Sequence, residues 1–184
     1  MTVRHVRRSG LYYRVCDPEW SDCADPTFSK RAGGRWNEPG RFGVLYLCRD
    51  LVVAAANARK NFEGEIHSLY DLKPEYRPVL LEFSLGRSPG HRFVDAVSSA
   101  GILALGLPAL YPLTANGGKV PHARCRAIGF AAYETDEAGI ACRSAAEPTA
   151  TSWVGEELAL FDRATGLAAP GKRRGFAAWY PMAK

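Results

Sequence analysis

The stretch GGRWNEPGRFGVLYL, residues 33–47, constrains the fold of this chain more than any other. Its glycines and its proline mark irregular backbone. Residues 44–47 then form a short apolar run that is typical of a buried strand. The stretch therefore predicts a loop that carries Arg35 and Trp36 to the edge of a sheet. Such large side chains in a glycine-rich loop suggest that the loop holds something.

The remainder of the chain alternates irregularly between short strands and a few helices. Apolar runs and turn signals predict strands at residues 11–16, 44–48, 78–85, 92–96, 139–144 and 157–161, and helices at residues 51–62 and 121–134. Asp50 is placed to cap the first helix. Residues 17–43, rich in Pro, Gly, Asp and Ser, read as one long loop.

This pattern predicts a mixed α/β fold in a single domain that spans residues 1–184. We expect its core over about residues 11–162 and a peripheral C-terminal segment at residues 163–184. No apolar run is long enough to span a bilayer, and no apolar segment follows the basic N-terminus. A cytoplasmic protein without membrane contact is therefore expected.

The charge and the cysteine content limit the kinds of ligand and site that this chain is expected to have. The net charge of +5 and the pI of about 9.0 suit an anionic ligand or an acidic partner. The basic residues are dispersed and no nucleic-acid-binding motif is present. The hypothesis of a nucleic-acid-binding or nuclease toxin is therefore supported by the pI alone. The five cysteines form no C-x-x-C pair and the four histidines lack ligand spacing. We expect neither a disulfide framework nor a metal site.

The loop offers the first candidate site residues. Arg31 and Arg35 carry planar guanidinium groups that match phosphate, beside glycines that let backbone N–H groups approach an anion. Trp36 either stacks on a ligand ring or fills the core. The alternative for the whole loop is a solvated segment with one buried Trp. Neither standard phosphate-loop motif is present.

Three further candidates follow along the chain. Tyr46 shares one strand face with Val44 and Cys48, and either points into a cleft or is buried. Asn57 is polar within an alanine-rich helix, so it must bond to backbone or face a cleft. Ser144 follows a predicted strand and lies either at the same cleft or on the surface.

The order of these segments resembles the RES-domain proteins, a family named for Arg, Glu and Ser. The matching segments are KRAGGRWNEPG at residues 30–40, LYL at 45–47, the alanine-rich helix, PVLL at 78–81, GI at 139–140, RS at 143–144 and LALFD at 158–162. The resemblance runs from about residue 11 to residue 162. The GGRWN-x-x-G segment with the following LYL strand is its most specific part.

The resemblance implies a fold similar to ADP-ribosyltransferases, with a split mixed sheet around an NAD cleft. It implies that NAD is the substrate, degraded by phosphorolysis or hydrolysis, or used for ADP-ribosyl transfer to a protein. It further implies a toxin that is neutralised by an Xre-type antitoxin covering the cleft. Nucleic acid would then be contacted only through the antitoxin, inorganic phosphate would be a possible acceptor, and no metal would be needed.

The resemblance also implies roles for the candidates. Arg31 and Arg35 would bind the pyrophosphate, and Tyr46 would stack on or orient the nicotinamide-ribose end. With Trp36, these residues form the predicted NAD-binding set. Asn57 would contact the ribose, and Ser144 would complete the site. We take Arg35, Tyr46, Asn57 and Ser144 as the catalytic set.

One position departs from the family pattern. The family's Glu belongs on the helix after the LYL strand, where this chain has Asn57, with Glu63 and Glu65 further on. An amide can bond a ribose hydroxyl but supplies no negative charge to an oxocarbenium-like transition state. The departure favours the alternative of a non-catalytic binding module.

Overall fold

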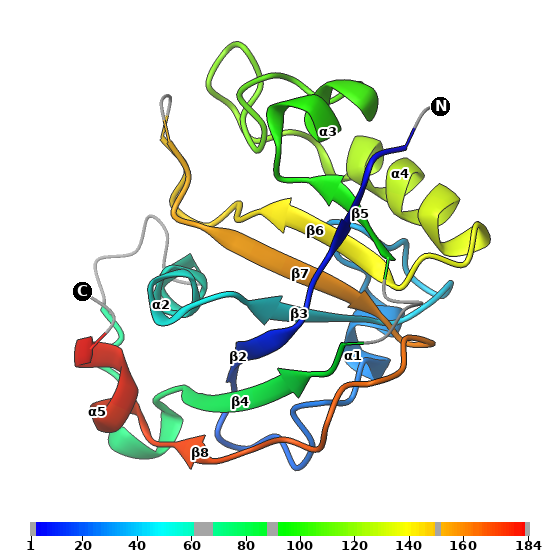
Figure 1. The fold of residues 1–184 in the computed structure, drawn as a ribbon. Helices are drawn as coiled ribbons and strands as arrows, with labels where there is room; N and C mark the ends of the chain where they lie inside the picture. Colours follow the sequence, from blue (N-terminus) through cyan, green and yellow to red (C-terminus); the bar gives the residue numbers. More distant parts are fainter. Residues whose placement is uncertain (1–2, 61–67, 88–91, 150–151, 183–184) are drawn as a thin grey trace.

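The computed structural model describes residues 3–60, 68–87, 92–149 and 152–182. Its centre is one eight-stranded sheet in the order β1-β5-β6-β7-β3-β2-β4-β8 (Figure 1). The strands are β1 His5–Arg7, β2 Gly10–Cys16, β3 Val44–Cys48, β4 Val79–Leu85, β5 Arg92–Ala96, β6 Gly139–Arg143, β7 Glu156–Phe161 and β8 Arg173–Arg174. The β5–β6 pair is parallel and the other described pairs are antiparallel. The predicted mixed α/β single domain is confirmed.

The helices lie around this sheet. Their bounds are α1 Thr27–Ala32, α2 Leu51–Lys60, α3 Ser99–Ala104, α4 His122–Glu134 and α5 Phe176–Trp179, with short 3₁₀ turns at Pro74–Tyr76 and Tyr180–Met182. Figure 1 shows α3 and α4 beside β5 and β6, with α2 near the end of β3. Asp50 caps α2 as predicted, because its Oδ1 accepts a hydrogen bond from the Val53 backbone N–H at 2.9 Å.

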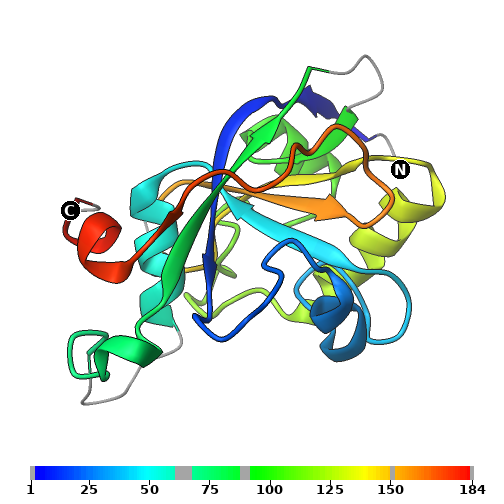
Figure 2. The same cartoon turned by 90° about the horizontal axis from the view of Figure 1, so that it is seen from below.

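The sheet is nearly parted between β2 and β3. These two strands pair only at Tyr13 and Cys48, whereas β3 pairs with β7 over five residue positions and β2 with β4 over seven. Figure 2 shows β2 and β4 running across the direction of β3 and β7. The sheet therefore has two parts that diverge from a single backbone contact, which is the split sheet that the resemblance implies.

Three apolar clusters hold the parts together. The first packs α4 and the loop at Trp36 against one face of β5, β6, β7 and β3. The second joins the other face of those strands to β2 and β4. The third lies under α2 and α5. Short side chains of α2, including Ala54, Ala55 and Ala58, are buried, which lets this helix sit close to β2 and β3.

Two expectations about irregular segments differ from the structure. Residues 17–43 are not one loop, because α1 lies within them. The segment after Thr165 is not peripheral: β8 pairs with β4, and Trp179 has no exposed surface. Elements at β1, α3 and α5 were not predicted. Residues 61–67, which contain Glu63 and Glu65, lie outside the described residues.

Candidate functional site

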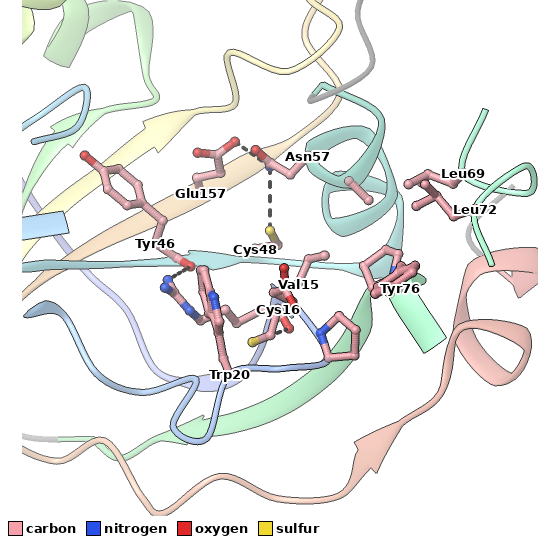
Figure 3. Close-up of a pocket in the computed structure, with 15 residues that line it drawn as sticks. Val15, Cys16, Trp20, Tyr46, Cys48, Asn57, Leu69, Leu72, Tyr76 and Glu157 are labelled. Carbon is pink, nitrogen blue, oxygen red and sulfur yellow. Dashed lines mark hydrogen bonds between the residues drawn. The ribbon is translucent and has the colours of Figure 1, made fainter. Parts of the chain in front are cut away.

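A cavity of about 420 Å³ opens where β2 and β3 part. Its volume lies within the range of about 300–1,000 Å³ that is usual for ligand pockets. Strands β2, β3 and β7, helix α2 and the segment after β2 all contribute to its wall. The lining residues are Arg14, Val15, Cys16, Asp17, Pro18, Trp20, Tyr46, Cys48, Asn57, Ala58, Leu69, Leu72, Tyr76, Pro78 and Glu157 (Figure 3).

Tyr46 connects this cavity to the glycine-rich loop. Its ring lines the cavity, and its hydroxyl accepts from the Trp36 backbone N–H at 3.1 Å and donates to Asn37 Oδ1 at 3.3 Å. Burial raises the pKa of the Tyr46 hydroxyl, and the Trp36 N–H opposes that shift. Tyr46 is therefore a neutral phenol whose position is fixed by the loop.

The loop itself is ordered by its own polar groups. Asn37 is fully buried, and its Nδ2 donates to the Ser29 carbonyl at 2.8 Å and to the Phe42 carbonyl at 3.0 Å. Gly34 lies against the Tyr46 hydroxyl and Asn37 Oδ1, so a Cβ at this position would clash with both. The glycines thus permit a close approach, and the loop presents a fixed backbone.

Trp36 lies in the core. Its side chain has no exposed surface, and its Nε1 donates to Cys142 Sγ at 3.3 Å. Gly129 of α4 sits directly against the Trp36 carbonyl, where any Cβ would clash. An enclosed indole has no free face for stacking on a ligand. Of the two alternatives for Trp36, the structure therefore shows the core role, and Trp36 does not line the cavity.

Arg35 is not among the residues that line the cavity, although its charge acts on the Tyr46 hydroxyl. It is half-buried, and its Nη1 donates to the Val120 carbonyl at 3.1 Å. His122 lies near Arg35, Arg126 and Lys60: burial lowers the pKa of its imidazole most, and these three cations lower it further. Arg126 also donates to the Gly34 carbonyl at 2.9 Å. The loop, the start of α4 and the end of α2 therefore form a cluster of positive charge.

Arg31 is not brought into the cavity. It lies on α1, is exposed, and its guanidinium is 5.9 Å from the centre of the Phe28 ring. A second arginine, Arg14 of β2, lines the cavity instead, and its Nη1 donates to the Tyr46 carbonyl at 3.1 Å. This bond spans the gap where backbone pairing between β2 and β3 stops.

Asn57 and Ser144 meet at a carboxylate. Asn57 Nδ2 donates to Glu157 Oε1 at 2.8 Å and to the Val53 carbonyl at 3.1 Å. Ser144 Oγ donates to the same Glu157 oxygen and is itself fully buried. Figure 3 shows the Glu157 carboxylate between the Tyr46 ring and the Asn57 amide. The two predicted residues therefore converge, but on a third residue that was not predicted.

Two buried thiols flank this carboxylate. Glu157 pairs with Cys48 of β3 on one side and with Cys142 of β6 on the other. Burial raises the pKa of both thiols well above the usual range, and the charge of Glu157 raises it further. Both cysteines are therefore neutral. All five cysteines are free and buried, as expected for a chain without a disulfide framework.

The family model of the RES domain matches residues 11–180. This chain belongs to the RES-domain family. Its fold is similar to that of a chain in the crystal structure of the M. tuberculosis MbcT–MbcA toxin–antitoxin complex, with a TM-score of 0.73 and 17% sequence identity. The match covers 97% of this chain and 91% of that chain. Among curated proteins, no relative with significant similarity was found.

Sequence reasoning predicted only Tyr46 and Asn57 among the residues that line this RES-domain cavity, and the most informative of those it missed are Arg14, Trp20 and Glu157. A signal existed for Glu157, because it is a charged residue on the same strand face as Ala159 and Phe161, which are buried. Trp20 is 37% exposed in a polar loop, where an aromatic residue of that size is unusual. Arg14 had no comparable signal, since charged residues commonly point outward from a strand.

The described residues also bear on metal binding and on membrane-spanning helices. Within residues 3–60, 68–87, 92–149 and 152–182, no group of three His, Cys, Asp or Glu side chains is arranged to hold a metal ion. None of the helices in those ranges has the length and apolar character needed to cross a bilayer.

Proposed function

We propose that this RES domain is the toxin of a toxin–antitoxin pair and that it consumes NAD⁺ at the cavity between β2 and β3. One observation supports the proposal most: Tyr46 lines a cavity that holds a fixed carboxylate, Glu157, and it is also within reach of the charge of Arg35, which belongs to a cluster of cations. A dinucleotide has a cationic ring at one end and a dianionic pyrophosphate in its middle. The two regions match those two charges.

The rings of the cavity suit the nicotinamide end. Tyr46 and Trp20 both line it, and aromatic rings stack readily on a flat heterocycle. The volume of about 420 Å³ accommodates a nicotinamide riboside but not a whole dinucleotide. The pyrophosphate would therefore extend past Tyr46 toward Arg35 and Arg126, whose guanidinium groups pair with phosphate.

The reaction breaks the bond between C1′ of the ribose and the nicotinamide nitrogen. The bonding electron pair leaves with the nitrogen, so that neutral nicotinamide departs and positive charge develops on the ribose. A carboxylate near that carbon stabilises the charge more in the transition state than in the ground state. An oxygen of phosphate or water then bonds to C1′, and its proton passes to solvent.

Incubation of the purified protein with NAD⁺, with and without phosphate, tests this proposal. Release of nicotinamide together with a phosphorylated ADP-ribose indicates phosphorolysis, whereas free ADP-ribose indicates hydrolysis. Transfer of label from NAD⁺ to a protein indicates ADP-ribosyl transfer. A folded protein that binds NAD⁺ yet releases no nicotinamide would leave the alternative of a binding module, which Asn57 at the family's Glu position favours.

The partner of a toxin would be an antitoxin of the Xre type that covers the cavity. The matched structure is a toxin–antitoxin complex. Beside the cavity of this chain, Trp20 and Phe28 are 37% and 55% exposed, and Arg31 lies next to Phe28. An antitoxin segment with apolar and acidic groups would complement this surface. Expression of the chain alone in the cytoplasm should slow growth, and co-expression of a neighbouring antitoxin gene should relieve it.

A further inference from the structure

Glu157 differs from the other acidic residue of the cavity in how it is held. Asp17 is exposed and accepts from the backbone N–H of Glu19 at 2.9 Å. Glu157 is half-buried on a central strand and accepts from two side chains of other elements, Asn57 and Ser144. A carboxylate fixed in this way keeps one position when a ligand enters, which is what electrostatic stabilisation of a transition state requires.

The bonds of Asn57 identify it as a donor to this carboxylate. Its Nδ2 lies within hydrogen-bond distance of two oxygens, Glu157 Oε1 and the Val53 carbonyl, and more weakly of Cys48 Sγ at 3.7 Å. An amide presents two N–H donors on that nitrogen, so both are used and the side chain has one favourable orientation. Asn57 therefore fixes the carboxylate and cannot replace it.

Ser144 has the same role. Its hydroxyl carries one proton, which is donated to Glu157, while its oxygen accepts from the Ala146 backbone N–H at 3.1 Å. The side chain is fully buried behind Glu157. Its proton and one of its lone pairs are used within the protein, and the side chain is enclosed, so Ser144 is a positioning residue and not a nucleophile.

We propose that Glu157 of β7 is the carboxylate that faces the cationic nicotinamide-ribose end of the dinucleotide, in place of the carboxylate that the family resemblance assigns to α2. Asn57 and Ser144 position it. Residue 157 then carries the carboxylate and residue 57 the amide, and the two side chains are hydrogen-bonded. The inference rests on the proposed function, because it names the group that acts on the NAD⁺ substrate.

Three variants test it. Glu157→Gln removes the charge and keeps the shape. The double variant Asn57→Glu/Glu157→Asn moves the carboxylate to α2 and conserves the atoms of the pair. Glu156→Gln is the matched control, because Glu156 is the adjacent residue of β7 and pairs with Arg8 on the opposite face.

Two readouts are measured for each variant. The first is the rate of nicotinamide release from NAD⁺. The second is the affinity for a carbocyclic NAD⁺ analogue, which has a cationic ring and resists cleavage, relative to the affinity for NADH, whose ring is neutral. The second readout reports the charge beside the ring whether or not the protein is an enzyme.

We expect Glu157→Gln to lose about 10²–10³ in the rate of nicotinamide release, the usual effect of removing one electrostatic group. Its preference for the cationic analogue should fall about tenfold. Glu156→Gln should retain both properties. The double variant should release nicotinamide at least about tenfold faster than Glu157→Gln. If Glu157→Gln does not fold, the double variant is compared with the wild-type protein instead.

The positioning role has its own readout. Ser144→Ala removes one donor to Glu157, so this carboxylate should lose its fixed position. The rate of nicotinamide release and the preference for the cationic ring should both fall, and Ser144→Thr, which keeps the hydroxyl, should restore most of both. A purely structural role for Ser144 would lower the melting temperature and leave the preference for the cationic ring unchanged.

The outcomes separate the inference from the proposed function. If the wild-type protein binds both dinucleotides and releases no nicotinamide, the proposed function is wrong, and the preference for the cationic ring still decides the role of Glu157. A folded Glu157→Gln protein with the wild-type rate and the wild-type preference overturns the inference. A wild-type protein that binds neither dinucleotide overturns both.

Discussion

Strand β3 pairs with β7 over five residue positions but with β2 only between Cys48 and Tyr13. On the β7 side, the backbone groups bond to the neighbouring strand and leave no space for a ligand. On the β2 side, they must find other partners, and the Arg14 side chain donates to the Tyr46 carbonyl. The cavity lies on this second side, which shows that the site exists because the sheet stops pairing there.

The two tryptophans near β3 follow the same division. Trp36 lies over the paired part of the sheet, between β6 and α4, and is fully enclosed. Trp20 lies beside the parted strands, lines the cavity and is 37% exposed. One residue type therefore stabilises the fold in one region and offers a binding surface in the other.

The sharpest test of this division is Trp36→Ala. Removing a fully buried Trp should lower the free energy of unfolding by about 3–5 kcal/mol, because the transfer energy is lost and a cavity remains. Urea unfolding monitored by circular dichroism measures this change. Trp20→Ala, on the open side, should cost less than about 1 kcal/mol. Equal losses in the two variants would contradict the division.

Local patterns predicted the central strands and α2 well. Each of β3, β4 and β7 is a short apolar run, and the observed bounds differ from the predicted ones by at most one residue. Asp50 and the alanine-rich sequence were sufficient to place α2. By contrast, β8 has two residues and α5 has four, which is too short for any periodicity to be detected.

The open side was harder to predict because its contacts join distant segments. The strand containing Glu157 was predicted, but its bond to Asn57 depends on the approach of α2 to β7. The sequence is compatible with both a stacking role and a core role for Trp36, because both roles favour the same residue type. What decided it was Gly129 of α4, which packs on its carbonyl and is far along the chain.

Arg35→Ala tests whether the glycine-rich loop contributes both to ligand binding and to the stability of the fold. If Arg35 binds the pyrophosphate, the substitution should weaken the free energy of NAD⁺ binding by about 1.5–3 kcal/mol, the range for hydrogen bonds to charged groups. The bond to the Val120 carbonyl is lost as well, so the free energy of unfolding should fall by about 0.5–1.5 kcal/mol. Calorimetric titration and thermal melting measure the two effects.

Two further variants test whether a loss of NAD⁺ affinity is specific to Arg35. Arg35→Lys should recover little affinity, because an ammonium group lacks the bidentate fork. Arg31→Ala is the matched control, because Arg31 is exposed on α1 and is not among the residues that line the cavity. An equal loss of affinity in Arg31→Ala would show that general positive charge attracts the ligand, and Arg35 would then have no specific role.

Trp20→Ala is expected to have a smaller effect on binding. Its ring is tilted against Phe28, with centroids 6.0 Å apart, and Trp20 is one of the residues that line the cavity. Loss of stacking on the nicotinamide should weaken NAD⁺ binding by about 0.5–1.5 kcal/mol. Trp20→Phe should retain most of the affinity. If both variants bind as the wild type does, Trp20 contacts the antitoxin surface and not the ligand.

The smallest expected effect concerns His122, at the boundary between α4 and the cation cluster. Burial and the charges of Arg35, Arg126 and Lys60 lower the pKa of its imidazole below the usual value of 6.5. The folded state then binds fewer protons than the unfolded state between the folded pKa and 6.5. Stability should therefore rise with pH through that window and fall as the pH drops through it. His122→Gln should remove this part of the pH dependence.

A bound dinucleotide should reverse the shift. Its pyrophosphate would place negative charge beside the same imidazole, so the pKa of His122 should rise when the ligand binds. NMR titration of the His122 ring, with and without the uncleavable NAD⁺ analogue, measures this directly. By linkage, affinity for the analogue should then increase as the pH falls through the window, because the bound state takes up a proton. An unchanged His122 pKa on binding would place the pyrophosphate away from this cluster and confine the ligand to the open side of β3.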